Sequence, residues 1–263
     1  MAQLLTDQCA GVVPRLAQRA HAVNLPGLIK ASGIDMRQVG AVAVAAGPGL
    51  APCLQSGMMV AKELSSTYGM PFIAVNHLEA HVAVAKLSFP TLSYPFVAAL
   101  VSGGNTQIVL ARGAGECHVV EERGGEEEDK WMEPIGDYVV LGSTLDDAFG
   151  EVCDKAAVLL ELPLKEGECW GAALVRFAEL GNARSFPFPR PMVGRKGCDM
   201  SFCAFKSKLR DYVLEAKGLN DELRANLAAS FVEGCVTHFE SKLKVALLWA
   251  KAVCSDLVIC SLL

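Results

Sequence analysis

Long hydrophobic runs, paired cysteine motifs and a secretion signal are all lacking in this sequence. No apolar stretch of the 263 residues reaches the ~20 that cross a bilayer, so no membrane association is expected. The ten cysteines include no Cys-x-x-Cys pair, which favours reduced intracellular thiols over a zinc cluster or a disulfide framework. The first residues lack the charged start and apolar core of a secretion signal. A net charge of -5 implies no broad polyanion-binding face, although a local basic patch remains compatible with it.

What the sequence has in abundance is apolar residues arranged as alternating strands and helices. Hydrophobic residues make up 52% of the chain and mean hydropathy is +0.32, which predicts a large buried core in one large or two small domains. The uncharged run 39–46 suits a strand buried on both faces. A helix over 50–68, ended by Gly69, and a short strand over 72–75 follow. This alternation predicts an α/β fold.

Two histidines, His77 and His81, provide the strongest indication of a metal site. On a helix they lie about one turn apart (roughly 3.6 residues) and can bind one ion together. Glu79 then points away from the pair, whereas the zinc-protease pattern places its general base directly after the first histidine. A helix that merely carries two histidines is the alternative interpretation.

A glycine-rich turn joins two strand-like runs over 96–101 and 107–110. Gly103 and Gly104 have no Cβ atoms to keep a phosphate away from backbone amides, and the hydroxyls of Ser102 and Thr106 can add donors. An ordinary hairpin turn is the alternative interpretation.

Further along, the segment beginning at Ser143 is predicted to open a helix that runs to about residue 161. Asp154 lies in it among apolar neighbours and needs a partner, which could be Lys155, a backbone donor or a ligand hydroxyl. Gly167 falls in the following loop, before a second helix over 169–181.

The distribution of charge singles out two more segments. Residues 121–130 are strongly acidic, which predicts a solvated loop. In the segment 184–210, by contrast, seven of the eight charged residues are basic. The basic segment could hold a phosphate backbone or simply be solvated. A long helix from 220 or 221 to about 254 and a closing strand over 256–260 complete the chain.

Taken in order, these motifs resemble the tRNA threonylcarbamoyladenosine synthase family, formerly called O-sialoglycoprotein endopeptidases or glycoproteases. The matching segments are Gly11–Pro14, Gly47–Leu50, His77–His81, Val101–Gln107, Thr144–Ala148 with Asp154–Lys155, Phe188–Pro191 and Ala228–Phe231. They cover nearly the whole chain. The His-Leu-Glu-Ala-His segment and the pattern Val-Pro-x-x-Ala-Gln over 13–18 look closer to the bacterial and organellar branch, so a mitochondrial location is expected, with a cytoplasmic one as the alternative.

The resemblance implies an α/β fold of the actin/Hsp70/sugar-kinase class (ASKHA). It would comprise two ribonuclease-H-like lobes, a first over 1–95 and a second over 96–263, incomplete at both termini. Members hold threonylcarbamoyl-AMP between the lobes and pass its threonylcarbamoyl group to N6 of the adenosine 3′ of the anticodon, in tRNAs that read codons beginning with A. Expected partners are therefore tRNA, threonylcarbamoyl-AMP, and a second copy or other subunits of a tRNA-modification complex.

Carried over residue by residue, the resemblance also assigns roles. His77 and His81 would be two ligands of one divalent iron or zinc ion that assists the acyl transfer. The turn that holds the phosphate of the adenylate would consist of Val101, Ser102, Gly103, Gly104 and Asn105. Asp154 would bind the ribose, and Gly167 would line the adenine end.

Departures from the family pattern leave three hypotheses open. The chain starts after the family's first strand and stops before a glycine-rich turn and the aspartate that supplies the third metal ligand, so that ligand is expected to be absent. Asn105 replaces a usual histidine, and Glu168 replaces a usual glycine. The chain could be a synthase, a short non-catalytic form that binds a full-length homologue, or, remotely, a metalloprotease.

Overall fold

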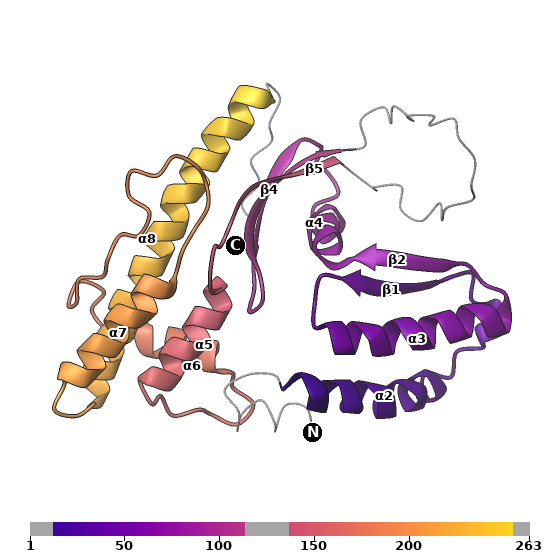
Figure 1. Ribbon diagram of the computed structural model, residues 1–263, viewed down its shortest axis with the longest axis horizontal. Coiled ribbons are helices and arrows are strands. Elements are labelled where there is room, and N and C mark those ends of the chain that lie inside the picture. Colours follow the sequence, from indigo (N-terminus) through magenta and orange to yellow (C-terminus); the bar gives the residue numbers. More distant parts are fainter. Residues whose placement is uncertain (1–12, 114–136, 255–263) are drawn as a thin grey trace. The chain divides into compact units, whose positions relative to one another are not determined.

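The computed structural model describes residues 13–113 and 137–254, which divide into two compact units (Figure 1). The first unit comprises residues 13–91, and the second unit comprises 92–113 and 137–254. The lobe boundary expected at residue 95 stays a prediction. The acidic loop expected over 121–130 and the strand expected over 256–260 lie outside the described residues.

The first unit is a small α/β layer. Its elements are helix α2 (Pro14–Ala31), the 3-10 turn η1 (Met36–Gln38), strand β1 (Val42–Gly47), helix α3 (Ala51–Tyr68), strand β2 (Phe72–Asn76) and helix α4 (His77–Ser88). Strands β1 and β2 run parallel, and α3 lies between α2 and this two-stranded sheet (Figure 1). Gly57 of α3 faces β1, where an added Cβ would lie 3.5 Å from Val44 Cγ2, an ordinary van der Waals contact. Gly69 ends α3 in the left-handed conformation (φ 66°), as predicted.

Strand β1 confirms the expected strand, but the prediction that both its faces are buried was wrong. Every residue of β1 is half-buried or exposed. In the described part of the first unit, β1 pairs only with β2, so few neighbours are available to cover it.

The second unit combines an antiparallel sheet with four helices. Its strands, in spatial order, are β3 (Phe96–Val101), β4 (Thr106–Gly113) and β5 (Asp137–Ser143). Its helices are α5 (Phe149–Leu159), α6 (Trp170–Ala178), α7 (Cys203–Glu215) and α8 (Asp221–Val253). The expected hairpin is confirmed as β3–β4, and the expected long helix as α8, which begins after an Asn220 cap whose side chain accepts from Leu223 N.

A continuous apolar core holds the second unit together. Its largest fully buried side chains include Phe202, Phe205, Phe231, Leu174 and Leu209. They come from α6, α7, α8 and the segment before α7, so each helix is fixed by contacts with the others. None of the described helices is long and apolar enough to cross a membrane.

The helix predicted to open at Ser143 was wrong at its start. Ser143 is the last residue of β5, and α5 begins only at Phe149. Thr144 pairs with Met200 in an isolated parallel bridge, so the backbone stays extended where hydroxyl and acidic residues had suggested a helix cap. Tertiary pairing therefore overrides a local capping pattern.

Candidate functional site

The imidazole pair lies on the first turns of α4. Asn76 caps this helix, because its side-chain Oδ1 accepts hydrogen bonds from Leu78 N at 2.9 Å and Glu79 N at 3.2 Å. His77 and His81 are both exposed, and their Nε2 atoms lie 3.3 Å apart. Sequence reasoning thus placed both histidines correctly on one helical face.

The separation of the two nitrogens fits one metal ion. A tetrahedral ion with metal–nitrogen bonds of about 2.1 Å holds two nitrogen ligands roughly 3.4 Å apart. Within residues 13–113 and 137–254, no group of three or more His, Cys, Asp or Glu residues could hold a metal. The described part of the chain therefore offers a two-imidazole site.

The glycine turn forms the tip of the β3–β4 hairpin. Ser102 N donates to Asn105 O at 2.8 Å, and Asn105 N donates to Ser102 Oγ at 3.1 Å. The Ser102 hydroxyl also donates to Asn105 O at 3.2 Å, so it closes the turn. Thr106 is fully buried and its Oγ1 accepts from Phe149 N at 2.8 Å, which points this hydroxyl into the protein. The expectation that both hydroxyls donate outward was therefore wrong.

The donors that the turn leaves open are backbone amides. Gly103 and Gly104 are exposed, and a Cβ added at either would meet nothing within 4 Å. No described residue accepts a hydrogen bond from their amides. Successive open N–H groups in a turn form an anion-binding concavity.

The first turn of helix α5 packs against this glycine turn. Gly150 N donates to Ser102 O at 3.1 Å, and a Cβ on Gly150 would lie 2.7 Å from the same oxygen. Gly150 therefore permits the close contact between helix and turn. Sequence reasoning missed Gly150, because the predicted helix began at Ser143 and placed this glycine in its interior, whereas it lies in the first turn of α5.

Asp154 lies on α5 and bonds to the start of α6. Its Oδ1 accepts from Gly171 N at 2.7 Å, so the backbone donor is the partner realised among the three that the sequence left open. Burial raises the pKa of Asp154, and the charge of Glu151 adds to the rise, while the Gly171 hydrogen bond opposes it. Gly171 was not predicted as a site residue.

Lys155, which the sequence offered as a possible partner of Asp154, pairs with two other acids. Its Nζ lies 2.9 Å from Asp147 Oδ1 and 2.8 Å from Glu151 Oε1. Asp147 also accepts from Lys206 Nζ at 2.6 Å. Although burial alone would raise the pKa of Asp147, its hydrogen bonds with these lysines and their charge lower it overall. Asp147, one of the acids expected at the start of a helix, instead joins α5 to α7.

Gly167 lies in an exposed loop with φ +75°, a conformation that favours glycine. The next residue, Glu168, closes this loop. Its carboxylate accepts from Arg176 Nε at 2.8 Å, from Arg176 Nη2 at 2.7 Å and from Lys165 N at 2.9 Å. The hydrogen bonds from Arg176 and Lys165 lower the pKa of Glu168 to about 2. The carboxylate of Glu168, at a position where the resemblance implies a glycine, is therefore fully paired within its own loop and helix α6.

In the second unit, the structure brings together the supported turn and α5, which also carries Asp154. Val101, at the end of β3, is 47% exposed beside this turn. His77 and His81 belong to the first unit. The described residues of this α/β protein thus provide an exposed imidazole pair in the first unit and an open-amide turn in the second unit.

Comparison with known proteins identifies the family. The family model for TsaD, tRNA N6-adenosine threonylcarbamoyltransferase, matches residues 2–135 and 123–261. A protein of that name from Rickettsia prowazekii (strain Madrid E) is 34% identical over 94% of this chain and 58% of its own length. Proteins of the same name from Rhizobium meliloti (strain 1021) and Brucella ovis are 39% and 40% identical, each over 84% of this chain and 55% of its own length. The chain belongs to the tRNA N6-adenosine threonylcarbamoyltransferase family.

These relatives are considerably longer than the chain. It spans about half the length of the curated relatives it matches, between 55% and 58% of the three above.

Proposed function

We propose that this chain acts in transferring a threonylcarbamoyl group from threonylcarbamoyl-AMP to N6 of the adenosine 3′ of the anticodon, in tRNAs that read codons beginning with A. The observation that carries the proposal is the family match along the chain, combined with an exposed turn that has two open backbone amides. The finer fold that we propose is the two-lobed ASKHA arrangement, which the mixed α/β character of both units supports.

The turn supports a role in binding the adenylate phosphate. The amides of Gly103 and Gly104 are free to donate to phosphate oxygens, and the absent side chains leave room for close approach. The bonds between Ser102 and Asn105 hold these amides in place before a ligand arrives. Preorganised donors of this kind stabilise negative charge that develops on a leaving group.

Asp154 and Gly167 are proposed to bind the nucleoside. Asp154 uses Oδ1 for the Gly171 amide, and no described residue donates to Oδ2, which is therefore available to a ribose hydroxyl. Gly167 leaves open space in its loop, where an adenine ring could lie without meeting a Cβ. Bound in this way, the nucleotide would present its acyl carbon to an incoming amine.

His77 and His81 are proposed to hold one iron or zinc ion. When bound, that ion would supply Lewis-acid polarisation of oxygens on the acyl adenylate. In the reaction, the N6 amine forms a bond to the carbamoyl carbon, the bond from that carbon to the phosphate oxygen breaks, and AMP and one proton leave. No nucleophilic side chain of the protein is required.

A binding role without catalysis is the second candidate. Helix α2 has no buried residue, and it exposes Val23 (76%) and Leu28 (65%) to solvent. Exposed apolar side chains on one helix support pairing with a second copy or with a longer homologue. We propose a mitochondrial location on the resemblance to the organellar branch, to be checked by fractionation, with a cytoplasmic one as the alternative.

The test is modification of tRNA in cells that lack the native synthase and express this chain. Mass spectrometry of their tRNA should reveal threonylcarbamoyladenosine with the unaltered chain and with His21→Ala, a control on an exposed histidine of α2. His81→Ala should reduce the modified nucleoside. Soluble expression without any modified nucleoside would refute catalysis and favour the binding role.

A further inference from the structure

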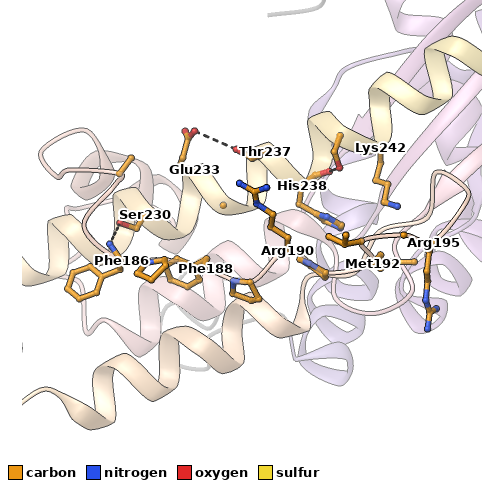
Figure 2. A pocket seen from close by; sticks show the side chains of 18 of the residues that line it. Phe186, Phe188, Arg190, Met192, Arg195, Ser230, Glu233, Thr237, His238 and Lys242 are labelled. Carbon is orange, nitrogen blue, oxygen red and sulfur yellow. Dashed lines mark hydrogen bonds between the residues drawn. The ribbon is translucent and has the colours of Figure 1, made fainter.

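A groove of about 1010 Å³ runs along α8 in the second unit. One wall is the loop over residues 183–195, and the other is a face of α8 between Ser230 and Val245 (Figure 2). Its volume is at the upper end of the roughly 300–1,000 Å³ of small-molecule pockets. The groove belongs to the basic segment that none of the roles above uses.

Positive charge dominates the lining of this groove. Arg184, Arg190, Arg195 and Lys242 line it, against one carboxylate, that of Glu233. The three arginines are exposed, and no ion pair joins any of them to another described residue. The groove therefore presents cations that are not neutralised by the described part of the chain.

Lys242 is the most informative of these cations because it is buried. Only 6% of the residue is exposed, and its Nζ donates to Gly197 O at 3.4 Å without a carboxylate partner among the described residues. Lysine is almost never buried so completely unless it is paired. Burial, reinforced by the charge of Lys242, also lowers the pKa of nearby His238, so this imidazole does not add to the charge. An anion in the groove would supply the missing partner.

The loop that faces Lys242 is fixed to the core. Phe186 N donates to Ser230 Oγ at 3.2 Å, and Tyr212 Oη donates to Pro187 O at 2.6 Å. The Phe188 ring packs edge-to-face on Phe231, with ring centroids 5.7 Å apart. Arg190 reaches from this anchored loop toward α8, and Lys242 points from α8 toward the loop (Figure 2). The loop that carries Arg190 and the buried Lys242 side chain are therefore fixed before any ligand binds.

The length of the groove favours a polyanion over a single nucleotide. Lys242 lies twelve positions after Ser230, so the two are about 18 Å apart along the axis of α8, at 1.5 Å per residue. A mononucleotide concentrates its charge at one end, whereas a nucleic-acid strand carries one phosphate for every nucleotide along its length. We propose that this groove binds the phosphate backbone of tRNA, an inference that rests on the proposed function and names where the tRNA is held.

The sharpest test replaces the buried ammonium and leaves its packing. Lys242→Met removes the charge and keeps an unbranched apolar side chain, so folding stability should be unchanged or raised while tRNA binding weakens. The matched control is Lys244→Met on the same helix, at a side chain that is 70% exposed and paired with Glu240 at 3.2 Å. Binding of an unmodified tRNA transcript is measured by fluorescence anisotropy at several salt concentrations.

The unaltered chain should bind this tRNA, and Lys242→Met should weaken binding about fivefold or more near physiological salt. The slope of log affinity against log salt should fall by about 0.9 for each phosphate that a variant no longer neutralises, and further in the double variant with Arg190→Ala. Unchanged affinity in Lys242→Met, an equal loss in Lys244→Met, or no binding by the unaltered chain would overturn the inference. So would displacement of tRNA by an acidic peptide at equal charge concentration.

These results are separable from the proposed function. A chain that binds tRNA through the groove but forms no threonylcarbamoyladenosine refutes catalysis and leaves the inference standing. Formation of the nucleoside with groove variants of unchanged affinity refutes the inference alone.

Discussion

The two units differ in how their candidate functional residues are supported. In the second unit, the glycine turn rests on α5, which packs into a core of fully buried residues such as Val152, Leu174 and Phe231. In the first unit, α2 has no buried residue, and α4 buries only Val82 and Ala85. The residues that we propose to bind the nucleotide are thus fixed by contacts with a core, whereas the imidazole pair lies on a capped helix with few buried residues. Mutations at the buried contact between the turn and α5 should accordingly lower stability and binding together, whereas mutations of the exposed imidazole pair should change binding alone.

The largest expected effect concerns the cores themselves. Leu174→Ala empties a fully buried position of α6 and should lower the free energy of unfolding by about 2–5 kcal/mol. Leu87→Ala, at an 80% exposed position of α4, should change it by no more than about 0.5 kcal/mol. Urea unfolding followed by circular dichroism measures both. Equal losses in the two variants would break the comparison.

The support of the turn can be tested with two glycines. Gly150→Ala would place a Cβ 2.7 Å from Ser102 O, and such overpacking should lower the free energy of unfolding by about 1–3 kcal/mol. Gly103→Ala meets only open space and should leave stability within about 0.5 kcal/mol of the unaltered protein. The same unfolding experiment decides, and a stable Gly150→Ala would mean that the turn does not rest on the helix.

The imidazole pair should be separable from stability. His81→Ala should lower affinity for Zn²⁺ at least about tenfold, because one of two nitrogen ligands is lost, while His21→Ala should not. Isothermal titration of the reduced protein measures both. The unfolding midpoint without metal should stay the same, since His81 is exposed. Equal Zn²⁺ affinities in His81→Ala and His21→Ala would refute a metal site at the imidazole pair.

The smallest effect is the dependence of stability on pH. The pKa of Glu168 falls from 4.5 to about 2 on folding, so its contribution is present above about pH 4.5 and is lost as the pH falls toward 2. Asp154 has the opposite sign, because its raised pKa opposes folding at neutral pH and protonation relieves this as the pH falls. Glu168→Gln should flatten the acid limb of the stability profile, and Glu240→Gln on the exposed face of α8 should not. Superimposable profiles for both variants would refute the role of the Glu168–Arg176 pair.

Local patterns predicted much of the structure, and longer-range contacts decided the rest. Apolar periodicity and turn residues correctly predicted β3–β4, α3 and α8. They failed at Ser143–Asp147, where acids that resemble a helix cap instead contact α7 and the segment before it, through Lys206 and Phe202. Sequence spacing could not reveal that contact, since the partners lie more than 50 residues away.

In the candidate site, too, local spacing predicted some features, and contacts between distant segments decided others. The face shared by His77 and His81 follows from helical spacing alone, and the structure agrees with it. The role of Gly171 and the burial of Lys242 depend on which helices meet, which the sequence does not encode locally. His238 and Lys242 occupy the buried side of α8 together with Phe231 and Ala246, so polar residues within an otherwise apolar stripe were the available signal.

The central claim is that the turn over Ser102–Asn105 binds the phosphate of an adenylate. Titration of AMP into the unaltered chain and into Gly103→Ala tests it most directly, because a methyl group at this open position blocks a ligand without disturbing the protein. Gly103→Ala should lower AMP affinity at least about tenfold, or about 1.4 kcal/mol, at an unchanged unfolding midpoint. Equal AMP affinity in the two proteins would contradict it.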